Sequence, residues 1–141
     1  MIEFEYQVGE ATPKAELSKE WLRNVALSES AEIVSLVYVF CSDAYLLELN
    51  QQFLKHDTYT DVICFDDSQG KSIQAEVYIS VDRVEENAAV YKVSLTDELH
   101  RVMAHALLHC LGYKDKSTKD ATVMRHKEDK ALELRPAELI N

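Results

Sequence analysis

The sequence has few of the residues that interrupt or cross-link a small protein. Its 141 residues include three glycines, two prolines and three cysteines. The cysteines, at positions 41, 64 and 110, are odd in number and widely spaced, which excludes a disulfide framework and a Cys-x-x-Cys metal knuckle. We therefore expect buried free thiols in a reducing cytoplasm. No Pro-, Gly- or Ser-rich linker divides the chain, so residues 1–141 are predicted to form a single domain.

Long apolar runs are also missing. No run approaches the roughly 18 residues that a membrane-spanning helix requires. The first residues lack the basic start and apolar stretch of a signal peptide. We therefore expect a cytoplasmic protein that does not associate with membranes.

Basic residues are outnumbered, because 15 Lys and Arg stand against 25 Asp and Glu, for a net charge of −10. This balance argues against a protein that coats nucleic acid through a generally basic surface. Residues 113–130 are the exception, with six basic and four acidic side chains. A site for a polyanion should therefore be local to this segment.

Hydrophobic periodicity predicts about four strands and about five helices. The predicted strands cover residues 2–8, 32–41, 62–65 and 75–80, and the predicted helices cover residues 14–29, 43–53, 82–92, 95–111 and 118–134. Ser42, Asp82 and Ser94 are the expected N-caps of the second, third and fourth helices. Two of the strands follow one another without a helix between them, which indicates an α+β fold with a mixed sheet.

The helix predicted at 95–111 is apolar over most of its circumference, as is typical of a central, buried helix. His105 and His109 lie one turn apart between its apolar faces, near enough to bind one ion. Gly112 can take the left-handed conformation that ends helices, which turns the chain so that Asp115 can return towards the histidines. These three side chains are the candidate metal ligands. The alternative is that both imidazoles bond to backbone carbonyls or to Glu98.

The spacing H-x-x-x-H-x-x-G-x-x-D matches the frame of the long metzincin zinc motif, in which three protein ligands leave one position for water. A metalloprotease of that class carries a glutamate after the first histidine as general base, whereas this sequence has Ala106. Peptide hydrolysis is therefore disfavoured. Two imidazoles and one carboxylate suit a single Zn²⁺ and do not exclude nickel or another transition ion.

With its surroundings, this motif resembles the YbeY-type rRNA maturation factors, which are metal-dependent single-strand endoribonucleases of the bacterial cytoplasm. The family signature H-G-x-L-H-L-x-G-Y-D-H corresponds to residues 105–115. A second block, L-N-x-x-Y-R-x-x-D-x-P-T-D-V-L-S-F, corresponds to residues 49–65, and a third, G-D-(I/V)-x-I-S, to residues 75–80. The blocks follow the family's order, and the chain has the family's length.

Several positions depart from the family pattern. Asp115 stands in place of a third histidine ligand, and Leu54 stands in place of an arginine; Tyr59 replaces a proline, and Ala75 and Glu76 replace a Gly-Asp pair. Aspartate can bind zinc, but its negative charge should acidify bound water less than a third imidazole would. The loss of the arginine removes a planar donor for phosphate.

The resemblance implies a zinc-dependent endoribonuclease that hydrolyses phosphodiester bonds of single-stranded RNA in rRNA maturation and ribosome quality control. Its partners would then be rRNA and the ribosome or ribosome-associated proteins. The ion would polarise a phosphoryl oxygen, supply hydroxide from its bound water, or both. The metal-bound water is then the catalytic group, and Lys55 or His56 could assist it as a point charge.

The same resemblance suggests residues for substrate binding. Lys114 and Lys116 flank the third ligand and could neutralise substrate phosphates, although lysines in a turn are usually solvated surface. Thr60 and Asp61 match the second block and could line the cleft or cap the start of a strand.

Other polar residues near the motif also have an expected role or position. Glu76 is a candidate hydrogen-bond partner for a ligand histidine. His100 and His126 are expected at the surface or its boundary, and Tyr113 is expected to pack under the turn. Two other functions remain open: a metallohydrolase of another substrate class, such as a peptide, and a non-enzymatic ribosome-assembly factor with a structural metal.

Overall fold

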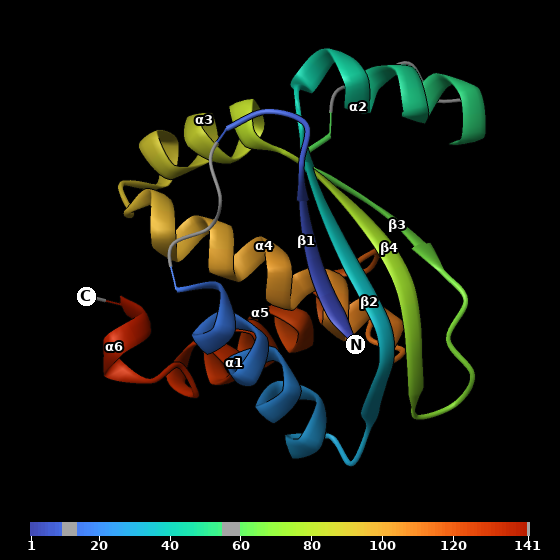
Figure 1. Cartoon of the computed structure of the whole chain (residues 1–141), viewed down its shortest axis with the longest axis vertical. Coiled ribbons are helices and arrows are strands. Elements are labelled where there is room, and N and C mark those ends of the chain that lie inside the picture. The colour runs from blue at the N-terminus through green and yellow to red at the C-terminus, as the bar shows by residue number, and fades with distance from the viewer. Residues whose placement is uncertain (10–13, 55–59, 141) are drawn as a thin grey trace.

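Four strands form one sheet within the part of the chain that the computed structural model describes, residues 1–9, 14–54 and 60–140 (Figure 1). In chain order the elements are β1 (Ile2–Tyr6), α1 (Ala15–Ser28), β2 (Glu32–Cys41), α2 (Asp43–Leu49), a π-helix (Asn50–Leu54), β3 (Val62–Asp66), β4 (Ser72–Ser80), α3 (Val81–Tyr91), α4 (Leu95–Cys110), α5 (Thr118–Glu133) and α6 (Ala137–Ile140). The predicted α+β class is confirmed, and the predicted number of strands holds for these residues.

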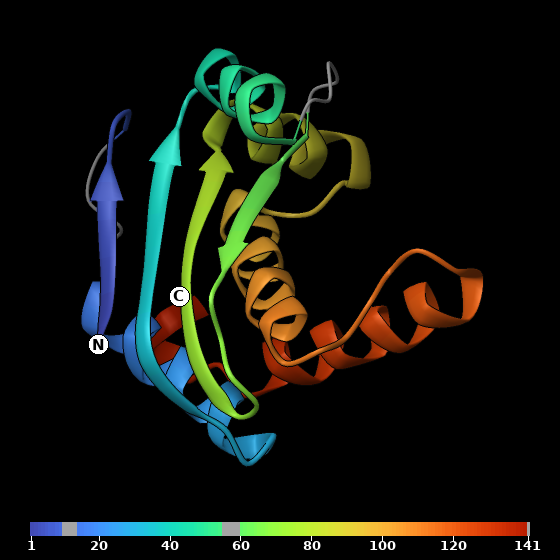
Figure 2. The ribbon, with the colours of Figure 1, turned by 90° about the vertical axis from the view of Figure 1, so that its right-hand side faces the viewer.

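The strand order in the sheet is β1-β2-β4-β3. β2 pairs in parallel with β1 and with β4, whereas the hairpin partners β3 and β4 are antiparallel. The sheet is therefore mixed, as predicted. β2 lies inside it because its nearly continuous apolar sequence can be covered on more than one side. Figure 2 shows the four strands side by side, with α4 running next to β3 and β4.

The main core lies between the sheet and the two helices α1 and α4. Trp21 of α1 and Met103 of α4 are fully buried against Tyr38 of β2. The two polar groups of these rings find backbone acceptors: Trp21 Nε1 donates to the carbonyl of Ala131 at 2.8 Å, and the Tyr38 hydroxyl donates to that of Met103 at 2.8 Å. These bonds allow large aromatic residues to be buried without an unpaired polar atom.

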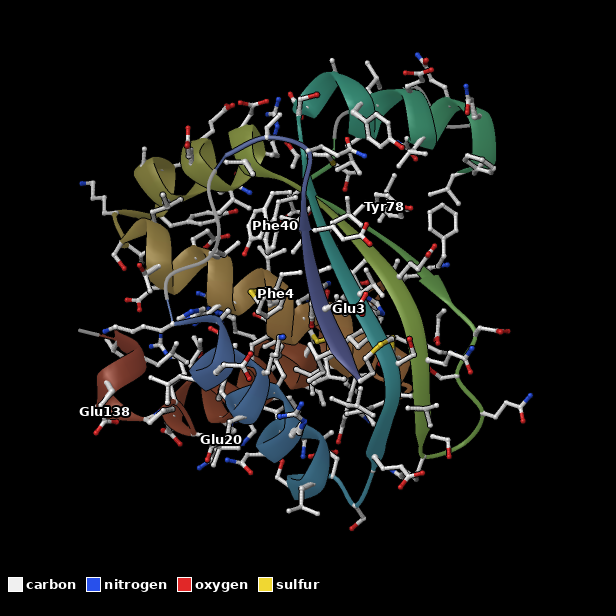
Figure 3. The ribbon with its side chains drawn as sticks, in the orientation of Figure 1. Glu3, Phe4, Glu20, Phe40, Tyr78 and Glu138 are labelled. Atoms are coloured by element: carbon white, nitrogen blue, oxygen red, sulfur yellow. The ribbon has the colours of Figure 1, made fainter. Side chains whose placement is uncertain are left out.

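A second, smaller apolar cluster covers the opposite face of the sheet beneath α2. Phe4 and Phe40 contact each other on the main-core side with ring centroids 6.2 Å apart, whereas Tyr78 points to the other side and meets Tyr45 of α2 at 6.4 Å (Figure 3). Among the described residues, no helix has both the length and the apolar character needed to cross a bilayer. All three cysteines are free thiols.

Several details of the predicted elements differ from the structure: the strand predicted at 2–8 ends at Tyr6, the strand predicted at 75–80 begins at Ser72, and α6 was not predicted. The helix predicted through position 53 is α2 up to Leu49, followed by a π-helix, because apolar spacing alone does not distinguish i→i+4 from i→i+5 bonding. The cap predicted at Asp82 for the third helix is Ser80 instead, whose hydroxyl accepts from the Arg83 N–H at 3.1 Å. The Asp82 carboxylate accepts from the Asp43 backbone N–H at 2.9 Å.

Candidate metal centre

The helix α4 carries the two histidines to the edge of the main core. Ser94 caps it by accepting from the Asp97 N–H at 3.0 Å, as predicted. The next turns are buried on most sides, which confirms the expected central helix. His105 and His109 lie on its least buried side, with 21% and 37% of their side chains exposed. The helix is thus anchored by its apolar faces and presents both rings to one opening.

The end of α4 returns Asp115 to the histidines. Gly112 has φ 102°, a conformation that favours glycine, and its N–H donates to the His109 carbonyl at 3.0 Å. The Tyr113 N–H donates to the Leu108 carbonyl at 3.1 Å. Together these bonds form a Schellman motif, which satisfies the last carbonyls and reverses the chain. The turn expected from Gly112 is therefore confirmed.

Three ligand atoms converge after this turn. Asp115 Oδ2 lies 3.3 Å from His105 Nε2 and 3.4 Å from His109 Nε2, and the three possible ligand atoms all lie within 4.8 Å of one another. In a tetrahedral site with bonds of about 2.1 Å, ligand atoms are about 3.4 Å apart. The spacing and chemistry of these donors therefore fit a transition ion such as Zn²⁺, with a fourth position left for another ligand.

Glu128 of α5 orients the first of these rings. Its Oε2 accepts from His105 Nδ1 at 2.6 Å, which fixes the tautomer that leaves Nε2 facing Asp115. Burial alone would lower the pKa of His105 and raise that of Glu128. The hydrogen bond and opposite charges between them outweigh burial, so the pKa of His105 is raised and that of Glu128 is lowered.

Arg101 holds Glu128 in turn. Its guanidinium donates to Glu128 Oε1 at 2.9 Å and to Asp129 Oδ1 at 2.8 Å. The Glu128 side chain is only 8% exposed, and its bonds to Arg101 and His105 offset the cost of burying its charge. Glu76, the residue predicted for this supporting role, is exposed on β4. The spacing indicates only that Glu128 is buried, since it shares one helical face with Met124 and Ala131; its contact with His105 follows from the packing of α5 on α4.

A cavity of about 590 Å³ lies beside the three candidate ligands. Thr60, Asp61 and Lys116 line it together with His105, His109 and Asp115, so the structure brings these predicted residues to one place. Ala106 and Leu54 also line it, whereas Lys114 is exposed outside its wall. Lys55 and His56 lie outside the described residues.

Three further side chains near the motif had predicted positions. Tyr113 does pack beneath the turn: its hydroxyl donates to Glu29 Oε1 at 2.5 Å, and the Lys127 ammonium lies 5.3 Å from its ring centre. The prediction that His100 lies near the surface is wrong, because it is 3% exposed, accepts from Arg135 through Nδ1 at 3.0 Å and packs against Trp21. The sequence did not indicate this burial because histidine is polar. A neutral imidazole with a hydrogen-bond partner can nevertheless lie in a core. His126 is exposed, as expected.

Comparison with known proteins agrees with the resemblance seen in the sequence motifs. The family described as "Endoribonuclease YbeY" matches residues 3–135. Similar curated proteins named "Endoribonuclease YbeY" include one of Cytophaga hutchinsonii, 52% identical over 118 residues that cover 83% of this chain and 82% of that protein. One of Flavobacterium psychrophilum is 48% identical over 134 residues that cover 95% of this chain and 96% of that protein. A solution structure from Thermotoga maritima, 30% identical, has a TM-score of 0.70 and the alignment covers 95% of this chain and 88% of that one.

Proposed function

The chain belongs to the endoribonuclease YbeY family, and from this membership we propose that it cleaves phosphodiester bonds of single-stranded RNA in the maturation of ribosomal RNA. The observation that carries the proposal is the convergence of His105 Nε2, His109 Nε2 and Asp115 Oδ2 at the wall of a cavity of about 590 Å³. A cavity of this size can admit a single strand of RNA. Ala106 supports this class over a metalloprotease, since it cannot act as a general base.

In this proposal His105, His109 and Asp115 hold one Zn²⁺, and a different transition ion remains compatible with the same donors. When bound, the ion supplies a Lewis acid for a phosphoryl oxygen and lowers the pKa of water. Glu128 retains the proton on His105 Nδ1, which keeps Nε2 available. Arg101 keeps Glu128 in place and compensates its charge.

The remaining predicted residues contact the RNA substrate in this proposal. Lys116 provides a positive charge beside the phosphate, and Thr60 and Asp61 form part of the cavity wall. Lys114, Lys55 and His56 are further candidates to contact the RNA strand. We place the protein in the cytoplasm, with ribosomal RNA and ribosome-associated proteins as partners, and treat residues 1–141 as one metal-dependent hydrolase-like domain. Three free thiols agree with a reducing compartment.

The test combines metal content with RNA cleavage. We expect purified wild-type protein to contain about one zinc ion per chain and to cut single-stranded RNA. His109→Ala should lose both properties while keeping its circular dichroism spectrum. His126→Ala is the matched control, because His126 is exposed on α5 and should leave both unchanged. If wild-type protein with its metal cuts no RNA, the proposed function is wrong.

A structural metal in a non-enzymatic assembly factor is the second candidate. Leu54 supports this second candidate, because an apolar side chain lines the cavity where the family pattern has an arginine. Loss of the folded circular dichroism spectrum in His109→Ala, together with ribosome binding but no cleavage by wild-type protein, would establish this candidate instead.

A further inference from the structure

A second cavity lies beside the candidate metal centre. It has a volume of about 260 Å³ and begins at His105 and Asp115. A smaller cavity of about 110 Å³ adjoins it, since the two share four lining residues. These four, which we call the flank groove, are Tyr91, Glu98, Arg101 and Arg125. They come from three helices, α3, α4 and α5, so the groove runs across α4 away from the ligands.

Of the two arginines in the groove, Arg125 is the one available to a ligand. Arg101 is already bound to Glu128 and Asp129. Arg125 is 63% exposed, and its ion pair with Glu128 Oε1 spans 4.0 Å, at the limit of such contacts. Glu128 is meanwhile held at 2.6–2.9 Å by His105 and Arg101, so it gains little from Arg125. An exposed guanidinium beside a site for phosphate chemistry is suited to bidentate binding of a phosphate.

The groove also contains an exposed aromatic ring. Tyr91 is the last residue of α3 and is 60% exposed, although it is a large and largely apolar side chain. Val90, Val93 and Leu95 beside it are also exposed, at 67%, 43% and 48%. Sites for single-stranded nucleic acid combine a cation for the backbone with an aromatic face for a base. Tyr91 and Arg125 provide both, next to the metal centre.

We infer that the flank groove binds the nucleotide adjoining the scissile phosphate, with Arg125 on a backbone phosphate and Tyr91 stacked on a base. This inference rests on the proposed function, since it extends the same RNA strand beyond the metal. It also gives the chain a guanidinium for phosphate, which position 54 lacks. Glu98, the acidic residue of the groove, is buried and has the positive charges of Arg101 and Arg125 near it, and the neighbouring Glu128 has Arg101 and His105 as partners.

The test measures binding and cleavage separately on metal-loaded protein. A labelled single-stranded RNA of about a dozen nucleotides is mixed in a stopped-flow instrument, and its anisotropy is read before cleavage begins. We expect Arg125→Ala to weaken binding about tenfold, and to flatten the slope of log K against log salt by about 0.7. Arg125→Lys should restore the salt slope but only part of the affinity, because a point charge lacks the fork.

Tyr91 is tested in the same way. Tyr91→Ala should weaken binding about tenfold, whereas Tyr91→Phe should bind like wild type because the ring remains. In cleavage assays the loss should appear mainly as a raised KM. Lys130→Ala is the control, since Lys130 is an exposed cation on α5 that pairs with Glu133.

The outcomes separate the two proposals. Unchanged binding and KM in Arg125→Ala and Tyr91→Ala, in a wild type that binds and cuts RNA, would overturn the groove alone. A wild type that binds RNA through Arg125 and Tyr91 without cutting it would support the groove and overturn the endoribonuclease. A wild type that binds no single-stranded RNA would overturn the groove.

Discussion

At the scale of single residues, Glu128 orients one of the candidate metal ligands, His105. It contacts His105 on the ring nitrogen away from Asp115, so it acts through the ligand and not on the ion. Residues in this position typically change metal affinity about 10- to 100-fold when replaced. The buried carboxylate is therefore as informative about the site as the ligands themselves.

Glu128→Gln should keep the shape of the site but replace a charged acceptor with a neutral one. We expect zinc affinity to fall by about 10- to 100-fold, as measured by competition with a chromophoric chelator. Glu133→Gln is the matched control, because Glu133 is an exposed glutamate on the same helix. Equal affinity of Glu128→Gln and wild type would show that the hydrogen bond does not tune the ligand.

A second buried residue, His100, should make stability depend on pH. Burial lowers its pKa from 6.5 to about 4, and the neighbouring Arg135 charge adds to this while Asp97 opposes it. Between about pH 4 and pH 6.5, His100 binds a proton in the unfolded chain but not in the folded chain. Stability from this group is therefore full above pH 6.5 and falls as the pH drops towards 4, by up to about 3 kcal/mol.

The measurement is urea unfolding of chelated protein from about pH 7.5 to pH 4, which keeps metal release out of the comparison. His100→Gln should be less stable than wild type at the upper end of this range, because it leaves a less well-packed partner for Arg135 and Trp21. Its stability should also fall less steeply with acid. Parallel curves for the two proteins would contradict a neutral, buried His100.

At the scale of elements, the junction after α4 carries the geometry of the site. Gly112 has φ 102°, and the space around it is open, so an added Cβ would meet no neighbour within 4 Å. The cost of a side chain there would be backbone strain and not a clash. Because Asp115 follows the same turn, strain at Gly112 should also displace a ligand.

Gly112→Ala should therefore cost about 1–3 kcal/mol of unfolding free energy, and should also weaken zinc binding. Gly70→Ala is the control, since Gly70 has φ 59° in the β3–β4 turn, away from the ligands. It should lose stability without losing zinc affinity. Urea unfolding and chelator competition measure the two effects, and a Gly112→Ala protein with wild-type affinity would contradict the role of this turn.

At the scale of the whole molecule, the candidate metal centre lies at one side of the apolar core. The buried contacts between α1, α4 and the sheet involve apolar side chains such as Trp21, Leu36 and Leu107. The candidate ligands are only partly buried. The fold should therefore outlast the loss of its ion.

Chelation should leave the far-ultraviolet circular dichroism spectrum unchanged at room temperature and lower the Tm. The reason is linkage: an ion at about 1,000 times its dissociation constant adds about 4 kcal/mol to the folded state. Calorimetry with and without a chelator measures the shift, and His126→Ala should shift by the same amount as wild type. Complete unfolding on chelation would favour the structural-metal candidate.

The sequence by itself determined the features that depend on neighbours along the chain. The i, i+4 histidines, the glycine turn and Asp115 fall within eleven residues, so the helix and the turn that ends it bring them together by local geometry. The strand and helix types followed from periodicity for the same reason.

Only the tertiary structure decided which distant residues join the site. Glu128 reaches His105 from 23 residues away, and Tyr91 and Arg125 line one cavity from two different helices. His100 is buried because Trp21 and Arg135 pack over it. These contacts depend on how the faces of α1, α3, α4 and α5 pack together, and ridge-and-groove packing is set by many side chains at once, which no local pattern in the sequence records.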